Sequence, residues 1–297
     1  MIQTPLYYKN SGSIPPLAMV LIFVVGTVVT WLLALVYAYA IAEIPFVYIS
    51  FLLTYFFGKG IGLTVNWLGK RGKARNTNFM INAAVILTLF GLYACWAIWF
   101  NAIAGRTDYF LWPGEVIGLI QVIAKTGAWS VFDSTPTGGA LYGVWAAEAL
   151  IIFIGALRAV ISKSRDTPFC EECNEWADDK VTIGPFTSIT DKKAFTDQIE
   201  QRAFQAITEL KILPSVYRKF SRIVLLRCPN CEQGNRFLTV MNIKIDLDQN
   251  DNKTEIEKVV FRNLIISAQE YDLLLNYPYM VEGEEDESTG NEGSATT

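Results

Sequence analysis

Long apolar runs dominate the first 162 residues, whereas short apolar and polar stretches alternate in the remainder of the chain. A helix needs about 20 mostly apolar residues to cross the hydrocarbon core of a bilayer. On this criterion the sequence predicts four membrane-spanning helices, over residues 17–41, 46–68, 79–103 and 141–161. The expected fold is therefore a four-span α-helical bundle in residues 17–162, followed by a water-soluble domain.

The second predicted span is the least regular, because Gly58, Gly60 and Gly62 alternate with Lys59 and Ile61. Small residues at this spacing are typical of close helix packing in membranes. Two interpretations of Lys59 are open. Either the helix ends near Gly58 and Lys59 lies at the membrane surface, or Lys59 lies within the span and faces protein or water.

Lys59 and Glu148 are the only charged residues well inside the predicted spans. A charge at the centre of a membrane helix costs on the order of 2.5–3.5 kcal/mol on insertion scales, so each side chain should face protein or water. Both residues are therefore candidates for a functional role within the membrane.

The connection between the third and fourth spans, residues 104–140, is long enough to contain structure of its own. Within it, residues 113–125 begin with Pro113, which suits the first position of a helix, and stop before Gly127. This apolar segment is too short to span a bilayer, and Trp112 and Trp129 flank it. We expect an external helix that is re-entrant or interfacial and covers the bundle.

Lys and Arg are distributed unequally over the predicted loops. Eight lie on one side of the membrane, and only Arg106 and Lys125 lie on the other. Because cytoplasmic loops carry an excess of Lys and Arg, this bias predicts that both termini, including the leader of residues 1–16, and the soluble domain are cytoplasmic. Short loops and the lack of a cleavable signal fit a multi-pass protein of a bacterial plasma (inner) membrane. The eight residues are Lys9, Lys70, Arg71, Lys73, Arg75, Arg158, Lys163 and Arg165.

Residues 165–281 have the pattern of a small α+β domain. Ser188 and Asp191 predict the start of a helix that reaches about Leu213, with one apolar face. Ser267 and Glu270 form a second capping pair and predict a short helix. Residues 180–186 have the pattern of a short strand. Three later strand-like stretches, residues 222–227, 236–246 and 255–266, predict a small antiparallel sheet.

The last residues of the sequence, 282–297, are acidic and rich in Gly, Ser and Thr. Such a segment has too few apolar side chains to bury and is expected to be disordered. It also accounts for most of the net charge of -4, so that charge does not indicate a nucleic-acid partner, which would require a clustered basic face.

Four of the five cysteines form two Cys-x-x-Cys pairs in the soluble domain: Cys170 with Cys173, and Cys228 with Cys231. Two such turns supply the four thiolates of a tetrahedral structural zinc site. The second turn, with Pro229 inside it and Gly234 soon after, resembles the knuckle of zinc-ribbon proteins, and Asn174 has the corresponding place after the first turn. The resemblance covers these turns and the nearby sheet and implies a zinc-ribbon-like domain.

Other uses of these cysteines are open. The 54 residues between Cys173 and Cys228 exceed the separation in a compact ribbon, although a longer loop costs only about 0.6 kcal/mol per doubling of its length. A thiol–disulfide site would lack the βαβ pattern of thioredoxin-like proteins, and an iron–sulfur cluster would have less typical spacing. The fifth cysteine, Cys95, lies in an apolar run and is interpreted as a packing residue.

The chain contains no histidine, which excludes histidine-dependent nucleophiles and histidine metal ligands. Because four thiolates also close the metal shell, the first hypothesis is a non-enzymatic membrane protein whose zinc-stabilised domain binds a cytoplasmic protein or assembles a membrane complex. The second hypothesis is a channel or transport component built from several copies of the chain and gated by the soluble domain. The third is a membrane-bound thiol oxidoreductase. Membrane lipid is an expected partner in each case.

Overall fold

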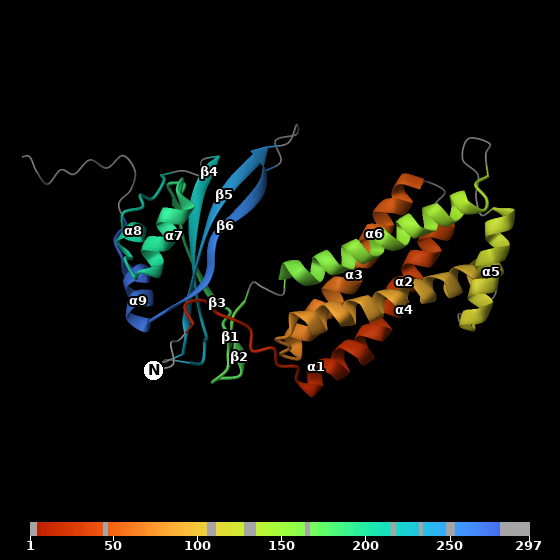
Figure 1. Cartoon of the computed structure of the whole chain (residues 1–297), viewed down its shortest axis with the longest axis horizontal. Helices are drawn as coiled ribbons and strands as arrows, with labels where there is room; N and C mark the ends of the chain where they lie inside the picture. The colour runs from red at the N-terminus through yellow and green to blue at the C-terminus, as the bar shows by residue number, and fades with distance from the viewer. Residues whose placement is uncertain are drawn as a thin grey trace, which may run out of the picture. The chain divides into compact units, whose positions relative to one another are not determined.

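The computed structural model describes residues 5–43, 47–105, 111–127, 135–163, 167–214, 218–231, 234–247 and 253–279. The chain divides into two compact units (Figure 1). The helical unit comprises the described residues from 10 to 163, and the sheet unit comprises residues 5–9 with those from 167 to 279. The predicted acidic tail, residues 282–297, lies outside the described residues.

The helical unit begins with a continuous 28-residue helical segment, Pro16–Glu43. It consists of α1 (Pro16–Val20), the π-helical turn η1 (Leu21–Val25) and α2 (Gly26–Glu43). Proline suits the first helical position, where its missing N–H leaves no hydrogen bond unmade. The helices that follow are α3 (Val47–Arg71), α4 (Thr77–Ile103), α5 (Pro113–Thr126) and α6 (Gly139–Lys163).

Three helices in the described part of the chain are long and apolar enough to cross a membrane: Pro16–Glu43, Thr77–Ile103 and Gly139–Ser162. They match the first, third and fourth predicted spans. The helix α3 matches the second in position but is not one of these three. It continues without interruption to Arg71, so the interpretation in which this helix ends near Gly58 is wrong.

Close packing against α6 explains why α3 continues through its glycines. A Cβ atom on Gly58 would lie 2.1 Å from the Ile152 carbonyl oxygen, and one on Gly62 would lie 2.2 Å from that of Ala156. Further along, the Asn66 side-chain amide donates a 2.9 Å hydrogen bond to the Ala159 carbonyl. The tertiary contact thus overrides the low helix propensity of glycine, and the predicted close helix packing is confirmed.

The same contacts give α3 a direction. Residues with higher numbers in α3 contact residues with higher numbers in α6, so α3 and α6 are parallel. Against the first helical segment the order is reversed: Gly72 lies against Ala18 at one end, and Phe57 stacks on Tyr37 with ring centroids 4.8 Å apart further along. Therefore α3 runs antiparallel to Pro16–Glu43.

The helix predicted at residues 113–125 is confirmed as α5, Pro113–Thr126. Its Val116 is buried with Ala97 and Phe100 of α4. The opposite side leaves Ile117 and Val122 each 57% exposed. A short helix with one packed face and one open apolar face suits a position in the interfacial layer of a membrane.

The sheet unit contains a four-stranded antiparallel sheet in the order β3-β4-β5-β6. Side chains alternate between its faces, as strand geometry requires. Ile223 and Leu225 belong to one apolar cluster, and Val224 and Leu226 belong to another. The strands are β3 (Asp179–Phe186), β4 (Lys219–Arg227), β5 (Arg236–Leu247) and β6 (Lys253–Ile266).

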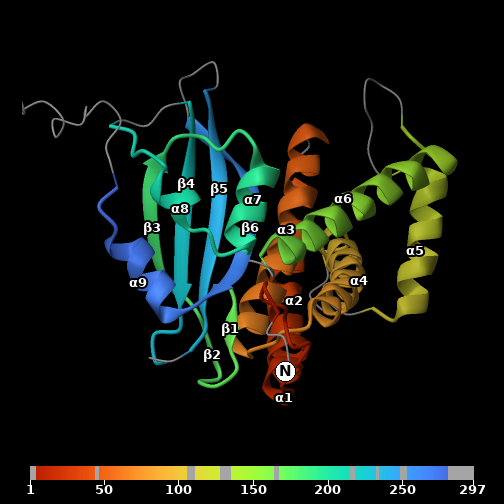
Figure 2. The ribbon, with the colours of Figure 1, turned by 60° about the vertical axis from the view of Figure 1, so that its left-hand side comes forward.

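Short helices cover one face of this sheet (Figure 2). They are α7 (Lys192–Glu200), α8 (Gln205–Thr208) and α9 (Ala268–Asn276). The capping box of Ser267 and Glu270 at the start of α9 is confirmed.

The prediction of one helix, opened by Ser188 with Asp191 and reaching about Leu213, is wrong. The N-cap is Asp191, α7 ends at Glu200, and α8 begins only at Gln205. The backbone of Arg202 has φ 65°, which a helix cannot accommodate. The Arg202 guanidinium also donates to the carbonyl of Ile265 at 2.9 Å and pairs with Glu270 at 3.2 Å. These contacts hold the break in place.

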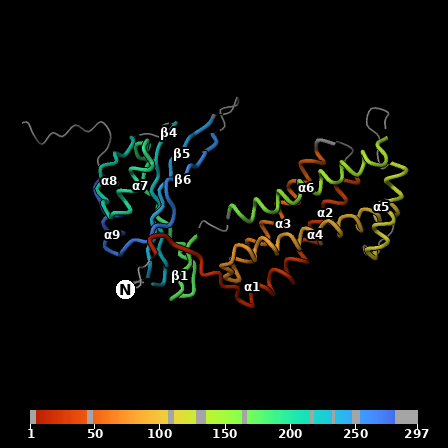
Figure 3. The backbone as a smooth tube through the Cα atoms, viewed as in Figure 1, coloured from red at the N-terminus to blue at the C-terminus, as the bar shows by residue number. Residues whose placement is uncertain are grey.

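Residues 5–9 belong to the sheet unit and not to the helical unit that follows them (Figure 3). Tyr7 forms an antiparallel bridge with Leu264 of β6. The Tyr8 amide donates to the Asn263 carbonyl, and the Ile265 amide donates to the Leu6 carbonyl, at 2.9 and 3.0 Å. The segment before the first helix is therefore part of the domain that follows the last one.

Candidate metal centre

The first cysteine pair lies in a tight hairpin. Its strands, β1 (Phe169–Cys170) and β2 (Glu175–Trp176), pair so that Cys170 faces Glu175, and the rings of Phe169 and Trp176 meet edge to face at 5.0 Å. Cys173 lies in the connecting turn. Asn174 completes this turn with φ 53°, a left-handed conformation that asparagine tolerates better than most residues.

The second pair lies between β4 and β5. Strand β4 ends at Arg227, immediately before Cys228, and Arg227 pairs with Arg236 at the start of β5. Gly234 lies against this turn. A Cβ atom there would be 2.5 Å from the Cys231 sulfur and 3.5 Å from the Cys170 sulfur, so a side chain would fill the space between the two pairs.

Sheet register brings the two turns together. Asp179, which begins β3 three residues after Trp176, pairs with Arg227 and also forms an ion pair with its side chain. A direct link reinforces the juxtaposition, because the Asn230 side-chain amide donates a 2.6 Å hydrogen bond to a carboxylate oxygen of Glu175. Both Cys-x-x-Cys turns therefore lie at the same end of the sheet.

The ligand atoms of Cys170, Cys173 and Cys228 all lie within 4.8 Å of one another. A tetrahedral zinc ion with Zn–S bonds of about 2.3 Å holds its sulfurs roughly 3.8 Å apart, so a small closure would complete coordination. All five cysteines of the chain are free thiols in this structure. These three residues can therefore hold a metal ion.

Cys231 lies beside this group and is a suitable fourth ligand. Its sulfur is 3.5 Å from a carboxylate oxygen of Glu172 and interacts with the Cys173 thiol. Cys170 and Cys228 are buried, whereas Cys173 and Cys231 are partly exposed. One side of the centre is thus packed into the domain and the other faces outward.

The clustered thiols perturb one another's ionisation. Burial opposes ionisation of Cys170, but hydrogen bonds from the Cys173 backbone and from the side chains of Cys173 and Cys228 outweigh it and lower the pKa of the Cys170 thiol. The hydrogen bond with Cys231, followed by burial, raises the pKa of Cys173. Burial raises the pKa of Cys228. Without a cation the cluster therefore favours one thiolate, whereas a divalent ion would stabilise several together.

The two charged residues singled out within the predicted spans are not brought together. Lys59 is half-buried on α3, and its Nζ lies 5.9 Å from the centroid of the Phe56 ring. Its backbone lies beside Gly155, seven residues beyond Glu148, which corresponds to about 10 Å along α6. No salt bridge joins Lys59 to Glu148 in the described part of the chain.

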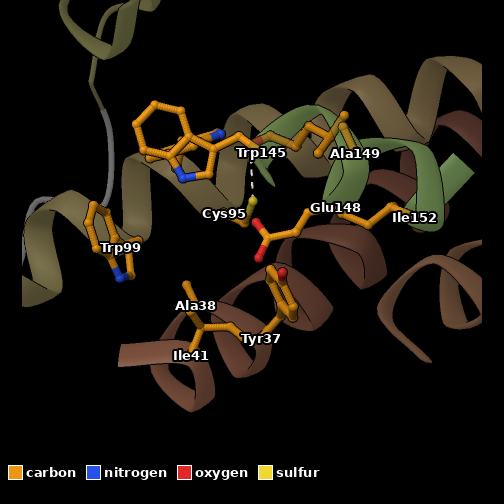
Figure 4. A pocket seen from close by; sticks show the side chains of 11 residues that line it. Tyr37, Ala38, Ile41, Cys95, Trp99, Trp145, Glu148, Ala149 and Ile152 are labelled. Atoms are coloured by element: carbon orange, nitrogen blue, oxygen red, sulfur yellow. Dashed lines mark hydrogen bonds between the residues drawn. The ribbon is translucent and has the colours of Figure 1, made fainter. Parts of the chain in front are cut away.

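Glu148 instead lines a pocket formed by α2, α4 and α6, together with Cys95 and aromatic side chains (Figure 4). The sequence marked Glu148 as unusual but gave no sign of these neighbours, because they come from helices distant in the chain. It likewise did not reveal Glu172 and Glu175 at the metal centre. Their positions, Glu172 directly before Cys173 and Glu175 directly after Asn174, were the only available signal.

No protein-family model, curated protein or solved structure matches this chain.

Proposed function

We propose that this chain is an integral membrane protein in which four helices anchor a zinc-stabilised domain at the cytoplasmic face, where the domain binds another protein. The observation that carries the proposal is the membership of residues 5–9 in the sheet unit. The sheet unit thus contains both the residues that precede the helical unit and the residues that follow it.

The antiparallel direction of α3 relative to Pro16–Glu43 supports a fourth membrane-spanning helix. The connection after α3 reaches the start of the first helical segment, because the Arg75 amide donates to the Ser13 carbonyl at 2.9 Å and the Asn76 side chain donates to the Gly12 carbonyl at 3.1 Å. At 25 residues, α3 is about 37 Å long, which exceeds the hydrocarbon core. A helix that runs the length of a membrane-crossing neighbour in the opposite direction crosses the membrane as well.

The flanking segments support an even number of crossings. Only residues 9–15 separate the sheet-bound Tyr8 from Pro16, and only residues 164–168 separate α6 from Phe169. At no more than about 3.6 Å per residue, neither connection is long enough to cross the hydrocarbon core of a bilayer, which is about 30 Å thick. The short connections thus support a helical unit that begins and ends on the same side of the membrane.

The charge distribution supports a cytoplasmic position for that side. Lys70 and Arg71 end α3, and Lys73 and Arg75 follow it, at the same end of the bundle as the start of α1. The positive-inside rule assigns such a cluster to the cytoplasm. Free cysteines and a thiolate zinc site also suit a reducing compartment.

A role in binding is supported by the closed ligand set and by an exposed strand. Four thiolates leave zinc without an open position for substrate. Strand β6 is at the edge of the sheet, and its residues 253–259 are exposed, including Ile256 and Val259 at 37% each. Residues 6–8 pair only near its other end. An exposed edge strand that carries two exposed apolar side chains suits a protein partner that adds a strand.

Purification of the full-length chain from its native membrane tests this role. We expect one protein to copurify with the wild type in a fixed ratio and to be lost from Cys228→Ser, which removes a metal ligand. Cys95→Ser is the matched control, since Cys95 lies in α4, and should retain the partner. Equal recovery with both variants would contradict the proposal, as would turnover of a substrate that depends on the cysteines.

A further inference from the structure

The helical unit contains a pocket of about 220 Å³ (Figure 4). It lies in the half of the bundle that includes the end of α2 and the beginning of α6, away from the basic end of α3. Its lining comes from three helices: Tyr37, Ala38 and Ile41 of α2; Leu92, Cys95, Trp96 and Trp99 of α4; and Trp145, Glu148, Ala149 and Ile152 of α6.

Glu148 is the one carboxylate in this lining. In Figure 4 its oxygens point between the Tyr37 ring and the Cys95 sulfur. The Cys95 thiol is already directed to the Leu92 carbonyl at 3.1 Å. The Tyr37 hydroxyl is engaged with Thr54 at 2.9 Å, and Thr54 in turn donates to Ser50. Within the described residues, no Lys or Arg side chain pairs with the Glu148 carboxylate.

The walls around this carboxylate are aromatic and fixed by mutual contacts. The Trp96 ring meets Trp145 edge to face at 5.0 Å and meets Trp99 at 5.7 Å. Stacking on Phe57 holds Tyr37. Trp96 and Trp99 are also backed by the cluster that contains Val116 of α5. Faces of Trp and Tyr attract cations, and such cages recognise substituted ammonium groups.

The remaining lining is apolar, so it favours carbon substituents over a hydrated inorganic ion. A metal cation such as Na⁺, Mg²⁺ or Ca²⁺ would require several oxygen ligands, which this pocket does not supply. Its volume is below the roughly 300–1,000 Å³ of pockets for drug-sized ligands. We propose that the pocket binds a small organic ammonium group, with Glu148 as its counter-charge and the tryptophans and Tyr37 as its cage.

The ammonium group could be carried by a free organic cation or by a choline or ethanolamine lipid head group. Both have the same chemistry, and the pocket lies in a part of the chain that we place in the membrane. The proposal involves only the helical unit, so it is independent of the metal centre and of the partner proposed above.

Binding of tetraethylammonium to the full-length protein in phosphatidylglycerol nanodiscs tests the proposal, with tryptophan fluorescence as the readout. We expect saturable binding that weakens by about tenfold or more in Glu148→Gln and in Trp145→Leu. Glu115→Gln is the matched control, because Glu115 lies on α5 outside the pocket, and should bind as the wild type does. Size-exclusion profiles and thermal melting confirm that each variant is folded.

Two further measurements complete the experiment: binding in phosphatidylcholine nanodiscs and competition with potassium. In phosphatidylcholine nanodiscs, reduced tetraethylammonium affinity would identify the lipid head group as the natural source, whereas unchanged affinity would identify a free cation. Absence of saturable binding by the wild type would overturn the proposal. So would equal affinity of Glu148→Gln, or displacement of the probe by potassium at equal concentration.

Discussion

The Tyr7 hydroxyl donates a 2.6 Å hydrogen bond to a carboxylate oxygen of Glu200. Tyr7 precedes the first helix of the helical unit and Glu200 follows the last one, so the bond joins residues 193 positions apart. The folded sheet unit therefore includes both flanks of the helical unit. Any membrane topology for this protein must place those two flanks on one side.

Replacing Tyr7 by phenylalanine should loosen the attachment of residues 5–9 to β6. The change removes a hydrogen bond to a charged group that is partly buried, and we expect a loss of about 1 kcal/mol from the stability of this attachment. Faster hydrogen exchange of the Ile265 amide, which is bonded to Leu6, would report it. Tyr277→Phe should leave exchange unchanged, because the Tyr277 hydroxyl makes no hydrogen bond within the described residues. Equal exchange in all three proteins would contradict the prediction.

Cysteine labelling in intact cells should show that α3 crosses the membrane. On a Cys95→Ala background, Lys73→Cys follows α3 and Gly138→Cys precedes α6. We expect an impermeant maleimide to label Gly138→Cys in intact cells and to label Lys73→Cys only after permeabilisation. If α3 stayed on the outer side after α2, Lys73→Cys would be labelled in intact cells. That outcome would exclude four spans.

Alanine at Gly58 should separate α3 from α6. Its Cβ atom would lie 2.1 Å from the Ile152 carbonyl oxygen, so the helices must shift, and we expect a loss of about 1–3 kcal/mol. Gly143→Ala on α6 is the matched control, since a Cβ atom there meets nothing within 4 Å. Alanine is the better helix former, so this control should be neutral or stabilising by up to about 1 kcal/mol. Melting temperatures in detergent compare the variants, and a stabilised Gly58→Ala would contradict the packing.

The helices were predictable because their signal is local. Apolar windows placed the spans within a few residues of the observed helices, and Pro113 with Gly127 bounded α5. The two Cys-x-x-Cys pairs identified a candidate metal site, since each pair is encoded by four adjacent residues. The strands β4 to β6 were predictable from short strand-like stretches, whereas the pairing of β3 with β4 was not predicted.

What the sequence could not reveal depends on contacts between distant residues. The pairing of Tyr7 with Leu264 spans almost the whole chain, and the short run of Leu6, Tyr7 and Tyr8 carries no periodic signal. The break at Arg202 is held by partners in β6 and α9, so helical spacing alone extended the helix too far. Likewise, the aromatic cage around Glu148 is assembled from three separate helices.

Metal analysis of the full-length chain, purified from membranes without chelator, is the most direct test of the proposed zinc site. We predict about one zinc per chain in the wild type and in Cys95→Ser, and loss of zinc in Cys228→Ser. The cysteines at positions 170, 173, 228 and 231 should resist alkylation until a chelator is added. Metal-free wild-type protein with rapidly alkylated thiols would contradict the zinc site, and a disulfide within either Cys-x-x-Cys pair would indicate a redox function instead.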